Sequence, residues 1–172
     1  MRNREALDAV IKAYDVRGVV GEDIDEAFVR DVGAAFASLW REENETTVAI
    51  GHDMRPSSPQ LADAFAEGVT SQGLDVIQLG LCATDQLYFA AGTLNCAGAM
   101  FTASHNPAQY NGIKLCRKGA TPVGEATGLA TIKNKMVEGI APDDVTPGTV
   151  THRDILSDYA DFLNGLVGLK ES

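Results

Sequence analysis

The sequence is poor in cysteine and lacks any long apolar run, and both shortages narrow the classes of protein to which it can belong. Its 3 cysteines, Cys82, Cys96 and Cys116, form an odd set without the spacing of a metal site. We expect small buried hydrophobic residues in a reducing compartment, which favours a cytoplasmic protein. No stretch is apolar enough to span a bilayer, and the first residues lack the hydrophobic segment of a signal peptide.

Basic residues are also scarce. The 172 residues include 14 Lys and Arg against 24 Asp and Glu, which gives a formal net charge of -10. This charge argues against nucleic acid and against anionic membrane surfaces as partners. The length is sufficient for one ordinary domain with a proper hydrophobic core.

Short apolar runs alternate with helical patterns along most of the chain. The runs at 48–51, 74–80 and 97–102 are expected to be strands covered on both sides. One amphipathic helix, capped by Asp25, is expected before the first run, and another after it, with Ser58 as its cap and Pro59 as its first residue. A third is expected between the second and third runs, marked by Leu87 and Ala91. Strands that alternate with helices in this way predict βαβ units, an α/β fold and a largely parallel sheet.

Further elements are expected after the third run. Asn111-Gly112 is a dipeptide typical of turns, and it is expected to lead into a strand at 113–116 that runs antiparallel to its neighbours. A helix is expected from about 125 to 137.

The segment 102–107, Thr-Ala-Ser-His-Asn-Pro, carries the strongest functional signal. It directly follows the apolar run that ends at Phe101, and ligands bind at such strand ends in open α/β sheets. Pro107 biases Asn106 toward an extended backbone, so we expect a stiff turn. The sequence therefore predicts a loop that presents the hydroxyl of Ser104.

Three segments, in the same order, resemble the α-D-phosphohexomutases, which include phosphoglucomutase, phosphomannomutase and phosphoglucosamine mutase. They are Lys-Ala-Tyr-Asp-Val-Arg-Gly at 12–18, Gly-His-Asp-Met-Arg at 51–55, and the motif at 102–107 with Tyr-Asn-Gly-Ile-Lys at 110–114. Ordered matches carry more weight than an isolated motif. The Tyr before Asn-Gly resembles the bacterial phosphomannomutase/phosphoglucomutase branch; phosphoglucosamine mutases, the alternative, more often have an acidic residue there. The resemblance implies a three-layer αβα domain with a mostly parallel mixed sheet, the first domain of these enzymes.

The resemblance also implies a reaction. Phosphorylated Ser104 gives its phosphoryl group to a hexose monophosphate, the resulting hexose 1,6-bisphosphate reorients, and its other phosphate returns to the serine. The net reaction interconverts hexose 1-phosphate and hexose 6-phosphate, with mannose or glucose as the sugar. Mg²⁺ would be held by phosphorylated Ser104 and by ligands of a second domain. A phosphoserine carries a charge of about -1.5 to -2, so it needs cations and N–H donors around it.

The resemblance assigns roles to six other residues. Lys114 is the candidate acid/base for the sugar hydroxyl and also binds substrate, and Arg17 braces the phosphate with its planar fork of donors. His105 and Asn106 orient the loop or the phosphoryl oxygens, and Tyr14 contacts the sugar. Arg55 is expected to support the loop from the neighbouring strand end.

Three of these side chains also have a purely structural explanation. Lys114 alternates with apolar neighbours, as on the solvent face of an edge strand. Arg17 has an ion-pair partner in Asp15, and Tyr14 fits a half-buried core position.

Two functions of other classes remain as alternatives. One is a non-catalytic sugar-phosphate-binding module. The other is a serine hydrolase, which we consider disfavoured because His105 is adjacent to Ser104 and adjacent side chains of an extended segment point to opposite faces. The Gly-x-Ser-x-Gly motif of many hydrolases is also missing.

The last part of the sequence is expected to lie outside the first domain, 1–148. Residues 139–148, with Pro142 and Pro147, have the composition of a linker. Residues 149–172 are expected to continue it and to form the first helix of a second domain, because an apolar stripe recurs there at helical spacing. In the family the first of four domains ends near this point, so the chain alone is not expected to complete the reaction.

Overall fold

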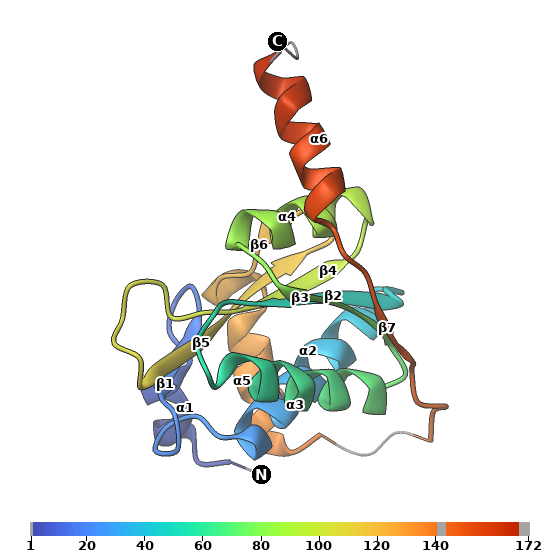
Figure 1. Ribbon diagram of the computed structural model, residues 1–172. Helices are drawn as coiled ribbons and strands as arrows, with labels where there is room; N and C mark the ends of the chain where they lie inside the picture. The colour runs from blue at the N-terminus through green and yellow to red at the C-terminus, as the bar shows by residue number, and fades with distance from the viewer. Residues whose placement is uncertain (1, 141–143, 169–172) are drawn as a thin grey trace.

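The computed structural model of the chain describes residues 2–140 and 144–168, and in these ranges one mixed sheet lies between helices (Figure 1). Its strands are β1 (Val16–Val19), β2 (Thr47–His52), β3 (Asp75–Leu81), β4 (Ala97–Phe101), β5 (Tyr110–Arg117), β6 (Thr121–Pro122) and β7 (Val150–His152). The strand order is β1-β5-β4-β2-β3-β7, with β6 paired to β5. Neighbours among β4, β2, β3 and β7 are parallel, whereas β5 is antiparallel to β4, β1 and β6.

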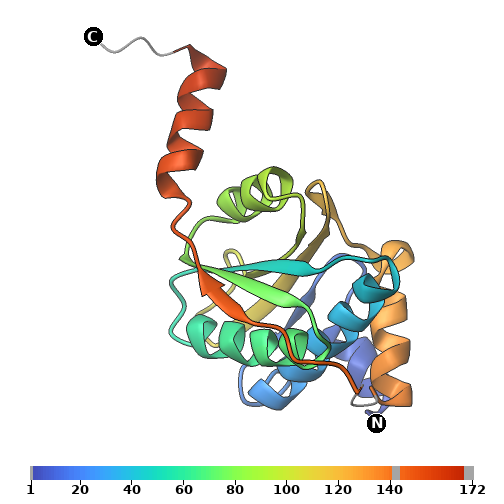
Figure 2. The ribbon, with the colours of Figure 1, turned by 90° about the vertical axis from the view of Figure 1, so that its right-hand side faces the viewer.

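The helices are α1 (Arg4–Val10), α2 (Glu26–Glu42), α3 (Ser58–Ser71), α4 (Thr84–Thr93), α5 (Leu129–Glu138) and α6 (Leu156–Val167), with a short 3₁₀ turn η1 (Glu125–Thr127). Figure 2 shows α4 on one face of the sheet and α2, α3 and α5 on the other. The predicted α/β class, the three layers and the mostly parallel mixed sheet are therefore confirmed. None of the helices in the described ranges has both the length and the hydropathy that crossing a bilayer requires.

The sheet separates two apolar cores because successive side chains of a strand point to opposite faces. Val48 and Ile50 of β2 lie in the larger core with α2 and α3, whereas Ala49 lies in the smaller core with residues of α4. Both faces of β2 are thus covered, which explains its continuous apolar run.

The helices α2 and α3 pack closely in the larger core, and glycines allow this approach. A Cβ atom on Gly33 would overlap the carbonyl oxygen of Phe65, and one on Gly68 would overlap that of Arg30. Neither oxygen can move without shifting a helix backbone. Two small residues therefore set the separation of the two helices.

The sequence did not predict four elements: α1 and β1 near the start of the chain, and the short strands β6 and β7. The segment that holds α1 and β1 is short, and charged residues interrupt its apolar ones, so neither element has a long apolar pattern. Asn3 caps α1 by accepting from the backbone N–H of Glu5 at 2.8 Å, and the antiparallel pairing of β1 with β5 is the second contact that fixes the segment.

The prediction of a turn at Asn111-Gly112 was wrong, because both residues lie inside β5. Asn111 is fully buried and donates to the hydroxyls of Ser57 and Ser58 at 2.8 and 2.9 Å. A Cβ on Gly112 would overlap the carbonyl oxygen of Val16 in β1. The dipeptide thus serves a buried polar contact and a close strand approach.

The predicted strands and helices otherwise occur with small shifts of their ends. Asp25 caps α2 by accepting from the backbone N–H of Phe28 at 2.6 Å, as expected. The cap of α3 is Ser57 rather than Ser58. The helix predicted at 125–137 is divided by Gly128 into η1 and α5.

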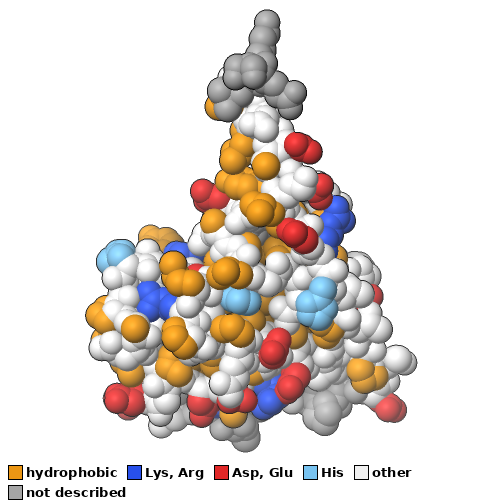
Figure 3. Space-filling view, viewed as in Figure 1, with side chains coloured by type: hydrophobic (Ala, Val, Ile, Leu, Met, Phe, Trp, Pro, Cys, Tyr) orange, Lys and Arg blue, Asp and Glu red, His pale blue; other side chains and the backbone are white. Residues whose placement is uncertain are grey.

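The tail first joins the sheet and then leaves it. The strand β7 pairs with β3, and Ile155 is buried in the smaller core. The helix α6 then projects from the body with its apolar side chains in the open, as Figure 3 shows; they include Leu156, Phe162, Leu163, Leu166 and Val167. Pro142 of the expected linker and residues 169–172 lie outside the described residues. The division into a first domain and the start of a second stays a prediction.

Because α2 and α3 are in close contact, adding one methyl group between them should change the stability of the protein. Gly68→Ala should lower the free energy of unfolding by about 1–3 kcal/mol, because the helices must move apart. Gly165→Ala is the matched control: it lies in α6 with nothing within 4 Å of its added Cβ, so stability should stay equal or rise. Urea unfolding measures both, and equal effects of the two substitutions would contradict the packing argument.

Candidate active site

Ser104 lies in the loop that joins β4 to β5, residues 102–109, which we call the serine loop. It is exposed, and its backbone has φ 54°, a left-handed conformation that is uncommon for a residue other than glycine. Its N–H donates to the hydroxyl of Thr102 at 3.0 Å. The structure thus places the predicted serine in a tight turn with its side chain open to solvent.

The expected orientation of His105 was wrong. The loop turns at Ser104 instead of staying extended, so the two neighbouring side chains come together and Ser104 Oγ lies 3.3 Å from His105 Nδ1. A contact between Ser104 and His105 is therefore compatible with the backbone of this loop. In the described ranges, however, this contact is the one hydrogen bond of the imidazole, so no third group orients it as in a catalytic triad.

Arg17 reaches the serine loop from β1. It donates to the side-chain oxygen of Asn106 at 2.7 Å and to the carboxylate of Asp15 at 2.6 Å. Its Nε is buried without a hydrogen-bond partner. Two predicted site residues, Arg17 and Asn106, are therefore in direct contact, and the ion pair foreseen as the structural alternative exists as well.

Lys114 lies on β5 beside the same carboxylate, with Nζ 3.9 Å from Asp15 Oδ2. The suggestion of an edge strand was wrong, because β5 lies between β1 and β4. Sequence reasoning gave Asp15 only a structural role as a partner of Arg17. Its position two residues before Arg17 was the available signal, since residues i and i+2 of an extended segment share one face.

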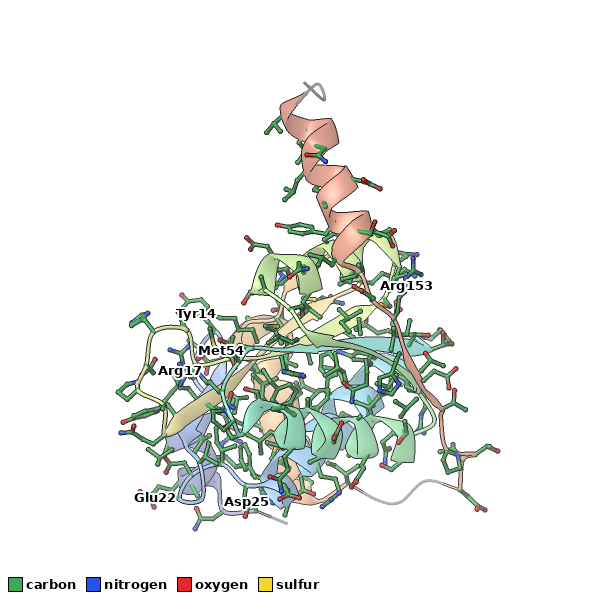
Figure 4. The ribbon with its side chains drawn as sticks, in the orientation of Figure 1. Tyr14, Arg17, Glu22, Asp25, Met54 and Arg153 are labelled. Atoms are coloured by element: carbon green, nitrogen blue, oxygen red, sulfur yellow. The ribbon has the colours of Figure 1, made fainter. Side chains whose placement is uncertain are left out.

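Tyr14 is not a core residue: it is 83% exposed. Figure 4 shows it on the same side of the molecule as Arg17 and Met54, which is equally exposed. Tyr14, Asp15 and Arg17 line a shallow pocket of about 430 Å³. An aromatic ring, a guanidinium and a carboxylate thus face solvent together, a set that can bind a phosphorylated polar ligand.

Arg55 supports the serine loop from the end of β2, as expected. Its buried guanidinium donates to backbone carbonyls of the loop and to the carboxylate of Asp53. Asp53 also accepts from the hydroxyl of Ser58 at 2.7 Å, so it acts as a turn residue. The loops after β2 and β4 therefore form one hydrogen-bonded unit.

The residues of this chain do not by themselves fit a magnesium site. No group of three or more His, Cys, Asp or Glu side chains gathers in the ranges that the structure describes. The nearby carboxylates of Asp15 and Asp53 are engaged by arginines. Ser104, once phosphorylated, is the one metal ligand that the sequence predicted here, so we derive no step through a metal.

Cys82 lies at the same edge of the sheet, directly after β3, and its N–H donates to the carbonyl of His52 at 3.0 Å. Burial raises the pKa of its thiol to about 11 and, in Cys116, to about 12. Both side chains are therefore protonated thiols at neutral pH and not nucleophiles. All three cysteines are free, and Cys96 and Cys116 are buried as the sequence predicted, whereas Cys82 is only half-buried.

Comparison with known proteins gives concordant matches. A family model described as "Phosphoglucomutase/phosphomannomutase, alpha/beta/alpha domain I" matches residues 8–141. A relative from Xanthomonas campestris pv. campestris, named "Phosphohexose mutases", is 40% identical over 141 residues, which are 81% of this chain and 30% of the relative. A phosphoglucomutase of Neisseria meningitidis is 38% identical over 163 residues, 94% of this chain and 35% of the relative.

A solved structure also matches. The crystal structure of a phosphoglucomutase/phosphomannomutase family protein from Burkholderia thailandensis superposes with a TM-score of 0.83 at 30% identity, over 96% of this chain and 36% of that chain. The chain thus spans about a third of the length of these relatives.

The raised pKa of Cys82 predicts a pH profile. Because only the thiolate reacts, alkylation of Cys82 by iodoacetamide should be slow at pH 7 and should rise about tenfold per pH unit through pH 9. The urea-unfolded protein is the control, in which the rate should level off near pH 9 because an exposed thiol has a pKa of about 8.5. Peptide mass spectrometry resolves the residue. A plateau below pH 9 in the folded protein would refute the prediction.

Proposed function

The chain belongs to the phosphoglucomutase/phosphomannomutase family, and we propose that the protein containing it interconverts hexose 1-phosphates and hexose 6-phosphates. The observation that carries this proposal is the exposed Ser104 hydroxyl in a left-handed turn at the end of β4, beside a contacting pair of Arg17 and Asn106. Ser104 is the proposed phosphoryl acceptor and donor. Mannose and glucose both remain candidate sugars.

The proposed reaction consists of two phosphoryl transfers. In the first, the P–O bond to Ser104 breaks as an oxygen of the hexose monophosphate forms its own P–O bond, which gives the bisphosphate. In the second, the other phosphate of the reoriented bisphosphate returns to the serine. Such transfers depend mainly on positioning and on neutralising the charge of the moving group.

Four side chains supply this environment in the proposal. The guanidinium of Arg17 has an unpartnered Nε, and it faces the loop through its contact with Asn106. Lys114 is the proposed acid/base that exchanges a proton with the sugar hydroxyl. His105, 3.3 Å from Ser104 Oγ, is placed to donate to a phosphoryl oxygen, and the open ring of Tyr14 is available to the sugar.

The positive charges near Ser104 support the proposal, whereas the net charge of the whole chain does not. The formal net charge of -10 would repel a sugar phosphate. Arg17 and Lys114 oppose this repulsion at one edge of the sheet, where both contact the carboxylate of Asp15. In the proposal, the phosphate on Ser104 binds beside these two cations.

The remaining parts of the proposed enzyme lie beyond this chain. We infer that residues 149–172 open a second domain, that this domain supplies most ligands of Mg²⁺, and that further domains bind the sugar. The chain's span of about a third of its relatives supports this division. Three free cysteines, two of them buried, fit a reducing compartment, so we place the enzyme in the cytoplasm.

Removing the Ser104 hydroxyl gives the direct test. In the natural protein that contains this chain, Ser104→Ala should abolish turnover of glucose 1-phosphate and mannose 1-phosphate, because no phosphoryl acceptor remains. A coupled enzymatic assay that detects glucose 6-phosphate and mannose 6-phosphate measures this turnover. Ser71→Ala, which removes a serine hydroxyl at the far end of α3, is the control and should keep full activity. Near-normal turnover by Ser104→Ala would rule out the phosphoserine mechanism.

The role of Lys114 is tested separately. Lys114→Met should lower kcat about 10²- to 10⁴-fold, the usual contribution of a general acid/base, with the fold intact. Lys118→Met is a matched control, since Lys118 is ion-paired with Glu45 beyond the end of the same strand. If both variants retained wild-type kcat, Lys114 would be a surface lysine only.

A further inference from the structure

Arg55 lies beneath the serine loop with its side chain 8% exposed. One terminal nitrogen, Nη1, donates to the carbonyls of Pro107 at 2.8 Å and Tyr110 at 3.0 Å. The other, Nη2, donates to the carbonyls of Ser104 at 2.9 Å and Asn106 at 2.8 Å. One side chain thus holds three carbonyls of the serine loop and the carbonyl of Tyr110, the first residue of β5.

The ion pair with Asp53 makes this arrangement possible in a buried place. Arg55 Nε lies 3.2 Å from Asp53 Oδ2, so all five N–H groups of the guanidinium have an acceptor. Asp53 is held in turn by the backbone N–H of Arg55 at 3.0 Å and the hydroxyl of Ser58 at 2.7 Å. The guanidinium charge of Arg55 is thus paired with Asp53, and Asp53 is bonded to Ser58 at the start of α3. These bonds hold the guanidinium rigidly in place.

The serine loop needs such an anchor at Ser104. A left-handed backbone persists at a residue other than glycine only where the surroundings determine it. Ser104 is held on both sides, its N–H by the hydroxyl of Thr102 and its carbonyl by Arg55. The direction of its Cα–Cβ bond follows from that backbone, because the position of Cβ is fixed by the backbone atoms N, Cα and C.

The same guanidinium acts on the neighbouring contact. Arg55 holds the carbonyl of Asn106, and the side chain of Asn106 accepts from Arg17. The buried guanidinium of Arg55 therefore helps to fix the distance between Ser104 and Arg17.

We propose that Arg55 is a positioning residue for Ser104. It fixes the serine loop so that the hydroxyl stands in its reactive place before any phosphate or sugar binds. The inference rests on the proposed function, because it takes Ser104 as the phosphoryl acceptor. A planar fork is needed: lysine has three donors on one nitrogen and cannot reach all four carbonyls, three in the serine loop and one at the start of β5.

The test compares Arg55→Lys with Arg30→Lys in the natural protein that contains this chain. Arg30 is an exposed arginine paired with Glu67, so its variant controls for loss of a guanidinium. Arg55→Lys should lower kcat about 100-fold, the cost of a displacement near 1 Å, with little change in KM. In Arg55→Ala, added methylguanidinium should restore part of kcat and methylammonium should not. Equal kcat in Arg55→Lys and Arg30→Lys would overturn the proposal.

Hydrogen exchange makes the test independent of catalysis. The amides of Ser104 and Asn106 should exchange faster in Arg55→Lys than in the wild type, whereas those of β2 and β4 should not change. Unchanged exchange in the loop would refute the positioning role. Absence of turnover in the wild type, with faster loop exchange in the variant, would refute the proposed function and leave Arg55 as the loop's anchor.

A second variant covers the case in which Arg55→Lys does not fold. Asp53→Asn keeps the shape of the side chain but removes the charge that pairs with Arg55. It should reduce kcat and speed the exchange of the same two amides. Wild-type values of both in a folded Asp53→Asn protein would overturn the proposal.

Discussion

The ion-paired guanidinium of Arg55 links the carboxyl ends of β2 and β4, and the position of the serine loop depends on that link. Parallel strands bring their carboxyl ends to one edge, but this places the loops only approximately. The loop after β4 has two backbone turn hydrogen bonds, in which the N–H groups of Asn106 and Tyr110 donate to the carbonyls of Ala103 and Pro107. Three of its carbonyls accept from a side chain of the neighbouring strand end, so the fold and the site are joined by the same few hydrogen bonds.

A second constraint is electrostatic. Asp15 engages Arg17 at 2.6 Å and lies 3.9 Å from Lys114. This carboxylate keeps two cations together in an acidic protein when no phosphate is bound. The side chain of Arg17 is 24% exposed and that of Lys114 is 33% exposed. Their interactions with an anion are therefore stronger than those of fully exposed charges. In the proposed reaction, a phosphate on Ser104 would meet donors that are already assembled.

Much of the fold could be predicted from the periodicity of apolar residues, and part of the site from three motifs in the order typical of the family. The runs around Val48 and Ala99 were readable as strands because both of their faces are buried. Arg17 and Asn106, 89 residues apart, were brought together by resemblance, and the structure joins them at 2.7 Å. Local patterns failed where tertiary contacts decided the outcome, as at Asn111, whose amide is used in the core instead of in a turn.

The error at His105 has the same origin. Adjacent side chains diverge only in an extended backbone, and the left-handed φ of Ser104 cannot be read from its residue type. Nor does sequence show that Arg55 has four carbonyl acceptors, since those bonds form only when distant strand ends meet. Asp15 was visible in the sequence, but its contact with Lys114 depends on the pairing of β1 with β5.

The most direct measurement is to locate the phosphate on the protein. The natural protein that contains this chain is incubated with glucose 1,6-bisphosphate, digested and mapped by mass spectrometry. The account predicts one phosphoryl group, on Ser104, that is lost again when hexose 1-phosphate is added. A phosphate on another residue, or none on a protein that turns over hexose phosphates, would contradict it.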